Sequence, residues 1–243
     1  MNLVIDLGNT LIKIAVFQEN TLLVKKVFLK SEFLKNLEEL ALKYTEIKDV
    51  LLSSVIKVPV KGLHFLQENY TVRVLDREMP QLFKNRYASP NTLGHDRIAL
   101  VSAAAKEYPT KNVLIIDSGT CITYDFKSAD NEYLGGAISP GIQMRYKAMH
   151  TFTQNLPLLE PEGEVQLIAT TTKNCIHSGV VNGITAEIEG IISQYKDRFP
   201  DLTIILTGGD AQFLCKRLKN SIFANSNFLL KGLNYILEFN KSQ

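Results

Sequence analysis

The chain has 243 residues, of which 45% are hydrophobic, and its basic residues exceed its acidic residues by only two. This length can fill one large hydrophobic core or two modest ones. The basic residues are scattered, which argues against a nucleic-acid-binding surface. No apolar run approaches the roughly 18 residues of a membrane span, and the N-terminus lacks a signal-peptide pattern, so we expect a cytoplasmic protein without a membrane partner.

The cysteines also bear on the compartment. Cys121, Cys175 and Cys215 are odd in number, widely spaced and without a Cys-x-x-Cys pair. This pattern argues against disulfides and structural zinc, and for a reducing cytosol. We expect each cysteine to be a small buried apolar residue.

The N-terminal runs 4–6 and 11–17 flank the turn residues 7–10 and predict a β-hairpin with Asp6 at the end of its first strand. Its turn offers backbone N–H groups, glycine permits close approach of a ligand, and a lysine adds positive charge, a set that suits a phosphate. The residues concerned are Gly8, Asn9, Thr10 and Lys13. Asp6 would face a metal ion or its water. A tight hairpin without a ligand remains the alternative for this stretch alone.

The first half continues as alternating strands and helices, which predicts a mixed sheet of the α/β class. We expect Ser31 to cap a helix with apolar positions Leu34, Leu37 and Leu40. The run Glu78–Leu93 lacks a pattern, and loops of this length usually bind something. The other expected elements are strands at 22–29, 50–56 and 72–75, a short helix after Pro59 and a helix from Gly94.

The second half repeats the opening design. Residues 113–120 give a strand, Asp-x-Gly and a hydroxyl residue, followed by a strand at 121–126. A third glycine turn, at 207–210, follows the apolar run 202–206. Three glycine turns at strand ends, two of them with an aspartate in register, are hard to explain by packing alone. The other expected elements are a strand at 133–138, a helix through 144–149, a long helix from near Asn174 and a closing helix at 228–239.

These turns resemble the nucleotide site of the acetate kinase, sugar kinase, Hsp70 and actin superfamily. More closely, the chain resembles the type III pantothenate kinases, which catalyse the first step of coenzyme A synthesis. The family motifs follow one another along nearly the whole chain: Asp-x-Gly-Asn-Thr at 6–10, Gly-x-Asp-Arg at 94–97, Asp-x-Gly-Thr at 117–120 and Gly-Gly-x-x-x-Pro-Gly at 135–141.

The resemblance implies an α/β fold of two duplicated ribonuclease H-like (actin-like ATPase) domains, with mixed sheets and a nucleotide cleft between the domains. We expect the domains at 1–110 and 111–243, with the last helix able to pack back on the first domain. ATP is the implied co-substrate, with Mg2+ held by Asp6 through water. The expected ATP-binding residues are Asp6, Leu7, Gly8, Asn9, Thr10, Leu11, Ile12, Lys13, Thr120, Gly208 and Gly209.

Asp117 ends a buried apolar run, so its charge needs a cation or hydrogen bonds to offset desolvation. The resemblance implies that it binds a monovalent cation, K+ or NH4+.

Asp96 lies in the first turn of its expected helix, where the helix dipole favours a carboxylate, so capping is one interpretation. The resemblance favours a general base, because a primary hydroxyl is a poor nucleophile until a carboxylate takes its proton. Arg97 would bind the carboxylate region of pantothenate, and His95 would contribute through its backbone. Tyr87 has the family spacing to the motif, and a surface tyrosine without a role is the alternative. The expected substrate-binding residues are Tyr87, Gly94, His95, Asp96, Arg97 and Thr172.

The long helix departs from the family at its start, where Ala169–Thr172 replaces Gly-Arg-Asn-Thr. Thr172 keeps the family spacing, and the resemblance implies a substrate contact across a homodimer with shared active sites. Gly179 and Gly183 should each cost about 1 kcal/mol relative to alanine, which predicts close helix packing. We expect Arg145 to be solvated and His150 to lie at the core edge, with substrate contact as the alternative.

The sequence thus predicts an ATP-dependent kinase that phosphorylates the primary hydroxyl of pantothenate. One alternative is a kinase of another small polyol or sugar, which would share the nucleotide turns. The other is a non-enzymatic actin-like nucleotide switch, which would turn over ATP slowly.

Overall fold

The computed structural model describes residues 1–54 and 56–241, and the chain divides into two compact units. The first unit contains Met1–Pro109, Asn131–Tyr133 and the C-terminal segment that begins at Asn227. The second contains Thr110–Asp130 and Leu134–Ser226. No helix within the described residues combines the length and the apolar character that crossing a membrane requires.

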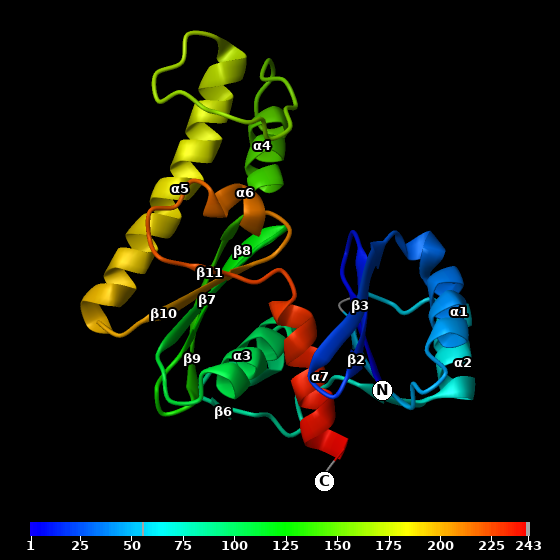
Figure 1. Ribbon diagram of the computed structural model, residues 1–243. Helices are drawn as coiled ribbons and strands as arrows, with labels where there is room; N and C mark the ends of the chain where they lie inside the picture. The colour runs from blue at the N-terminus through cyan, green and yellow to red at the C-terminus, as the bar shows by residue number, and fades with distance from the viewer. Residues whose placement is uncertain (55, 242–243) are drawn as a thin grey trace. The chain divides into compact units, whose positions relative to one another are not determined.

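The first unit is built on a five-stranded sheet with the order β3-β2-β1-β4-β5 (Figure 1). All six residues of the central strand β1 are buried, the polar Asn2 and Asp6 included. The elements of this unit are β1 (Asn2–Leu7), β2 (Ile12–Gln18), β3 (Thr21–Phe28), η1 (Lys30–Glu32), α1 (Phe33–Lys43), β4 (Asp49–Ser54), α2 (Val60–Asn69), β5 (Thr71–Val74), β6 (Lys84–Asn85), η2 (Pro90–Thr92), α3 (His95–Glu107) and α7 (Phe228–Lys241).

The sheet of the second unit runs β11-β10-β7-β8-β9, and β6 pairs with β9 at Glu132 and Tyr133. Its longest helix, α5, is drawn in yellow and gold in Figure 1. The elements are β7 (Val113–Ser118), β8 (Cys121–Lys127), β9 (Glu132–Pro140), α4 (Ile142–Thr151), α5 (Thr172–Arg198), β10 (Thr203–Thr207), α6 (Ala211–Cys215) and β11 (Phe223–Ala224).

The two sheets follow one plan. Strand β1 pairs antiparallel with β2 and parallel with β4, while β7 pairs antiparallel with β8 and parallel with β10. In each sheet a further strand extends the hairpin side, and another strand lies beyond the parallel neighbour. The predicted mixed sheets and duplicated α/β design are therefore confirmed. Each repeat brings one glycine turn to the end of its first strand.

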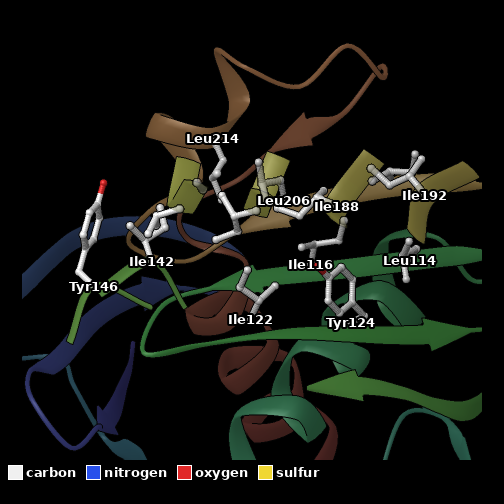
Figure 2. Close-up of a cluster of buried hydrophobic side chains, with 14 of the residues drawn as sticks. Leu114, Ile116, Ile122, Tyr124, Ile142, Tyr146, Ile188, Ile192, Leu206 and Leu214 are labelled. Carbon is white, nitrogen blue, oxygen red and sulfur yellow. The ribbon is translucent and has the colours of Figure 1, made fainter. Parts of the chain in front are cut away.

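Each unit has its own hydrophobic core. In the first, Phe33, Leu37 and Leu40 of α1 pack with the buried side chains of β1 and β2. In the second, Ile188 and Ile192 of α5 face the sheet residues around Ile116 (Figure 2). The helical spacing of the apolar positions places them on one face, which gives each core its second layer.

Several local expectations were wrong. Ser31 lies inside the 3-10 helix η1 and does not cap α1, whose N-cap is Glu32. No heavy atom of the described residues lies within 4 Å of a Cβ built on Gly179 or Gly183, so these glycines do not mark close packing within this chain. Strand β4 ends at Ser54, and Val55 of the strand expected at 50–56 lies outside the described residues.

Candidate functional site

The first glycine turn joins β1 to β2. Asp6 lies opposite Lys13 in the strand pairing, and 3.5 Å separates the Lys13 ammonium nitrogen from Asp6 Oδ2. The backbone N–H of Gly8 donates to the carbonyl of Leu11 at 3.2 Å, which closes the turn. The turn residues Asn9, Thr10 and Leu11 are exposed, as a ligand-binding turn requires. Leu7 and Ile12 are buried, so only their backbone can meet a ligand.

Asp6 is a buried carboxylate beside the first glycine turn. Its pKa is raised, first by burial and also by the negative charge of Asp96, while Lys13 opposes the rise. The carboxylates of Asp6 and Asp96 are therefore close enough to interact, although 90 residues of chain separate them. Two neighbouring carboxylates, one of them buried, form a suitable place for Mg2+, which takes one or two carboxylates together with phosphate oxygens and water.

Asp96 lies in the first turn of α3, whose N-cap is Gly94. The backbone N–H of Arg97 donates to Asp96 Oδ1 at 2.9 Å, so the carboxylate does serve the helix start. A Cβ on Gly94 would lie 2.3 Å from the same oxygen, which shows how closely the carboxylate folds over Gly94. Oδ2 makes no hydrogen bond to any described residue, and it can accept a proton from a substrate.

Arg97 and Tyr87 come together as the sequence motif implies. Arg97 is buried, and its guanidinium carbon lies 5.5 Å from the ring centre of Tyr87 and 5.9 Å from that of Tyr133. The rings of Tyr87 and Tyr133 are stacked at 5.9 Å. Tyr133 was not predicted, because its place beside the motif depends on the pairing of β6 with β9. This cluster combines a cation with aromatic surface, which suits an organic anion.

His95 begins α3 beside the end of β4. Burial and the nearby positive charge of Arg77 lower its pKa, and a hydrogen bond to the backbone of Ser54 opposes this. The imidazole therefore favours its neutral form, and its hydrogen bond to Ser54 holds it at the end of β4. Its expected backbone contribution to substrate binding stays a prediction.

The second and third glycine turns adjoin each other in the second unit. The N–H of Asp210 donates to the carbonyl of Ser118 at 3.0 Å. Gly208 has a φ of +96°, and a Cβ there would lie 2.2 Å from Ser118 O and 2.4 Å from Asp117 Oδ1. Two oxygens thus lie together against Gly208, too close to admit a side chain there, and oxygens are the ligands that hard cations prefer.

Thr120 lies in the turn between β7 and β8. The N–H of Gly119 donates to the carbonyl of Cys121 at 2.9 Å, and the N–H of Gly141 donates to that of Thr120 at 3.2 Å. A Cβ on Gly141 would lie 2.2 Å from Gly119 O. The last glycine of the 135–141 motif, Gly141, therefore allows its own segment to pack directly against the turn at Gly119 and Thr120.

A cavity of about 990 Å³ opens beside the third glycine turn in the second unit. Arg217 stacks on Phe213 at 3.7 Å and donates to the carbonyl of Gly163 at 2.6 Å, which fixes one wall. Apolar, amide and charged side chains share the lining. The lining includes Glu162, Val165, Asn182, Thr185, Gly209, Gln212 and Lys216.

Thr172 is the first residue of α5 and is exposed, while the preceding Thr171 accepts the N–H of Asn174 at 3.2 Å as the helix cap. The predicted residues thus fall into two groups. The first unit carries the opening turn, Tyr87 and the 94–97 motif, and the second carries Asp117, Thr120, Thr172 and the third glycine turn.

Two expectations about side chains need correction. Arg145 is not a solvated residue, because it pairs with Glu187 at 2.5 Å and donates to Ser139 Oγ and the carbonyl of Pro140. Tyr124 donates to the other oxygen of Glu187 at 2.9 Å. His150 is exposed, and its Nδ1 contacts the carbonyl of Leu156 at 2.8 Å.

The cysteines are less buried than expected. Cys175 is exposed, and Cys121 and Cys215 are half-buried. All three are free thiols.

The chain is similar in sequence to known type III pantothenate kinases. Over its full length the chain is 58% identical to the type III pantothenate kinase of Christiangramia forsetii, of which it covers 100%. It is 45% identical over 98% of both chains to that of Flavobacterium johnsoniae, and 41% identical over 100% of both to that of Bacteroides fragilis.

Solved structures agree on the fold. A protein of Campylobacter jejuni assigned to the Baf family of transcriptional activators has a TM-score of 0.63 at 22% identity, covering 99% of this chain and 100% of its own. A glucokinase from an Antarctic psychrotroph has a TM-score of 0.53 at 13% identity, with 98% of each chain covered. The fold is therefore that of the actin-like ATPases and sugar kinases. The family model described as "Type III pantothenate kinase" matches residues 2–194, and the chain belongs to the type III pantothenate kinase family.

Proposed function

We propose that the protein transfers the γ-phosphoryl group of ATP to the primary hydroxyl of pantothenate, the first step of coenzyme A biosynthesis. Membership of the family supports this reaction. The observation that carries the residue assignment is the electrostatic proximity of Asp96, at the start of α3, to Asp6, at the end of β1.

Asp96 acts as the general base. Its Oδ1 is held by the N–H of Arg97, which leaves Oδ2 to accept the hydroxyl proton. The deprotonating hydroxyl oxygen bonds to the γ-phosphorus while the bond to the bridging oxygen breaks and ADP leaves. Arg97 and Tyr87, 5.5 Å apart, bind the carboxylate end of pantothenate and orient the hydroxyl.

The opening turn binds the phosphates. Gly8 closes the turn through its N–H, Asn9 and Thr10 offer N–H and side-chain donors, and Lys13 supplies positive charge beside Asp6. Asp6 would hold Mg2+ through water, and the metal would neutralise charge on the phosphates. The raised pKa of Asp6 supports this assignment, because a bound cation favours the ionised form that burial disfavours.

In the second unit, Asp117 would hold a monovalent cation, K+ or NH4+. The two oxygens that lie together beside Gly208, Asp117 Oδ1 and Ser118 O, support this assignment. Such a cation would stabilise the phosphate charge. Gly208 and Gly209 would border the adenosine, for which the adjacent cavity of about 990 Å³ offers room, and Thr120 would contact the nucleotide.

The proposal includes a homodimer with shared active sites. Thr172 is exposed at the start of α5, and the exposed glycines Gly179 and Gly183 leave a helix face that another backbone can approach closely. Leu167 and Ile168, just before this helix, are 81% and 82% exposed. A second copy would cover this apolar surface. The free cysteines suit a reducing compartment, so the proposal also includes a cytoplasmic location.

The test is a coupled ADP-release assay with pantothenate and a panel of sugars and polyols. The proposal predicts rapid ADP release with pantothenate and release near the ATP-only background with every sugar. Turnover of a sugar with pantothenate inactive would contradict it. Slow ATP hydrolysis unaffected by any acceptor would instead favour a nucleotide switch.

A further inference from the structure

One glycine sets how closely helix α7 approaches α3 within the first unit. A Cβ built on Gly232 would lie 1.8 Å from the carbonyl oxygen of Ala99 and 2.5 Å from its carbonyl carbon. Both residues are buried. Because the atoms in the way belong to the backbone, no side-chain rotation can relieve the contact. A larger residue at position 232 must move one of the two helices.

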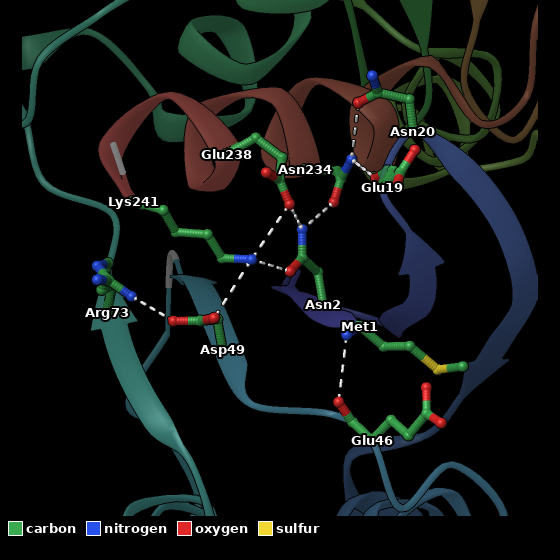
Figure 3. A network of polar contacts seen from close by, with 10 residues as sticks. All are labelled: Met1, Asn2, Glu19, Asn20, Glu46, Asp49, Arg73, Asn234, Glu238 and Lys241. Carbon is green, nitrogen blue, oxygen red and sulfur yellow. Dashed lines mark hydrogen bonds and ion pairs between the residues drawn. The ribbon is translucent and has the colours of Figure 1, made fainter. Parts of the chain in front are cut away.

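Helix α7 is fixed on its other side by a network of polar contacts (Figure 3). Asn234, fully buried, accepts from Asn2 Nδ2 at 2.7 Å and donates to the carbonyl of Glu19 at 2.8 Å. Near the end of the helix, the ammonium group of Lys241 lies 3.2 Å from Asp49 Oδ2. These contacts hold α7 on β1 and β4. A larger side chain at position 232 should therefore displace α3 and leave α7 in place.

The far end of α3 is tied to α7. Lys231 Nζ and the Tyr235 hydroxyl contact Glu107 Oε1, in the last residue of α3, at 2.8 Å and 3.0 Å. At about 1.5 Å per residue, Ala99 lies about 4.5 Å along the axis from Asp96 and about 12 Å from Glu107. A displacement at Ala99 therefore tilts the end of α3 that carries Asp96, with Glu107 as the pivot.

We infer that Gly232 and Asn234 are positioning residues for phosphoryl transfer. Asn234 fixes α7 on β1, and Gly232 allows α3 to approach α7 at the distance that places Asp96 beside Asp6. Neither residue touches a reacting atom. The inference rests on the proposed role of Asp96 as the base. It assigns to the C-terminal helix a part in catalysis through the placement of one carboxylate.

The test compares Gly232→Ala with Gly62→Ala. Gly62 is also a buried helical glycine of the first unit, but a Cβ there meets the ring of Phe33 at 2.5 Å, in α1, and not α3. Measured below both melting transitions, Gly232→Ala should lower kcat about 10- to 100-fold, because a misplacement of about 1 Å costs up to about 100-fold. The KM for ATP should stay within about twofold of wild type. Gly62→Ala should lose stability and keep its kcat.

A double variant separates positioning from general destabilisation. Asn234→Ala alone should lower kcat about threefold, because α7 is less well fixed. In Gly232→Ala/Asn234→Ala the released α7 can yield in place of α3, so kcat should rise from the Gly232→Ala value toward that of Asn234→Ala, while the melting temperature falls further. A merely structural role predicts that activity and stability both worsen.

Wild-type kcat in folded Gly232→Ala, or a double variant less active than Gly232→Ala, would overturn the inference. Should Gly232→Ala not fold, Asn234→Ala carries the test, and an unchanged kcat in it would overturn the inference. Asp96→Asn, assayed in parallel, distinguishes a failure of the proposed base from a failure of the proposed positioning role. If it stays active, the proposed base is wrong, whereas an inactive Asp96→Asn with unaffected Gly232→Ala refutes only the positioning role.

Discussion

The carboxylate of Asp6 lies 3.5 Å from the ammonium group of Lys13, its partner across the β1–β2 hairpin, yet the pKa of Asp6 is raised. Burial is the largest cause, and the charge of Asp96 adds to it. The ion pair therefore does not compensate for desolvation. The ionised form of Asp6 therefore costs stability, as a ligand-binding carboxylate can.

Asp6→Asn should accordingly raise the melting temperature at pH 8 while abolishing activity. A raised folded-state pKa means that the folded protein gains stability from this group as pH falls through that pKa, with no further gain below the unfolded value of 3.8. The advantage of Asp6→Asn should thus shrink toward zero as the pH approaches 3.8. Thermal melts of both proteins at pH 8 and pH 4 measure this.

Asp49→Asn is the matched control with the opposite sign. Arg73 and Lys241 hold the pKa of Asp49 below its usual value in spite of partial burial. Its stabilising effect is present above the unfolded value and is lost as pH falls through the folded one. Asp49→Asn should therefore melt lower than wild type at pH 8 and closer to it at pH 4. Identical pH trends for the two variants would refute the electrostatic account of Asp6.

A second prediction concerns Arg145 in the second unit. Although burial opposes it, hydrogen bonds from Arg145, Ser139 and Tyr124 lower the pKa of Glu187. Arg145→Met leaves this half-buried carboxylate without its cation and should cost about 2 kcal/mol, or about 5 °C in melting temperature, at pH 8. The loss should shrink as the pH falls below 4.5 and through the lowered pKa of Glu187, because protonation removes the charge that Arg145 stabilises.

Arg86→Met provides the comparison for Arg145. Its pair with Glu132 at 2.7 Å is more exposed, and surface pairs contribute little. Its melting temperature should stay within about 2 °C of wild type. Equal losses for the two variants would show that the Arg145 pair is no more important than a surface contact.

A third prediction concerns the proposed cation at Asp117. Activity should require K+ or NH4+ in addition to Mg2+, and compact Na+ should substitute poorly. Asp117→Asn should lose most of the K+ dependence together with most of the rate, because the pair of oxygens beside Gly208 then lacks its negative charge. The assay varies K+ in sodium buffers scrubbed of ammonium. Full wild-type activity in sodium alone would exclude a K+ requirement.

The sequence predicted the strands and turns best. The apolar residues of β1 and β7 and the Asp-x-Gly motifs at the ends of these strands are local features, and both strands and both turns formed where expected. Ser31 does not cap α1 because residues 30–32 form a 3-10 helix instead. In this turn the Glu32 carboxylate accepts the N–H of Leu29 at 3.2 Å.

Other parts of the site could not be read from the sequence. The partner of Arg145 lies 42 residues away, and Asn234 lies 232 residues from Asn2. The stacking of Tyr87 on Tyr133 depends on a two-residue strand pairing with no periodic signal. The spacing of motifs identified the residues that we propose to face the ligand, but not those that hold them in place.

A fourth prediction tests the shared active sites of the proposed homodimer. Asp96→Ala and Thr172→Ala are each expected to be inactive, but they should be lesions in two halves of one site. After dissociation and mixing, half of the dimers contain one of each, and one of their two sites is intact. Activity should therefore recover to about a quarter of wild type. Subunit exchange is checked with differently tagged chains, and exchange without recovery would place Thr172 outside the partner's site.

The role of Asp96 as the base of a pantothenate kinase is tested by the rate of phosphopantothenate formation by Asp96→Asn. We predict a loss of about 100-fold or more in kcat. ATP binding and melting temperature should be nearly unchanged, because asparagine can still accept the N–H of Arg97 that Asp96 Oδ1 accepts at 2.9 Å. A folded Asp96→Asn with the wild-type rate would contradict the account and leave Asp96 as a residue of the helix start alone.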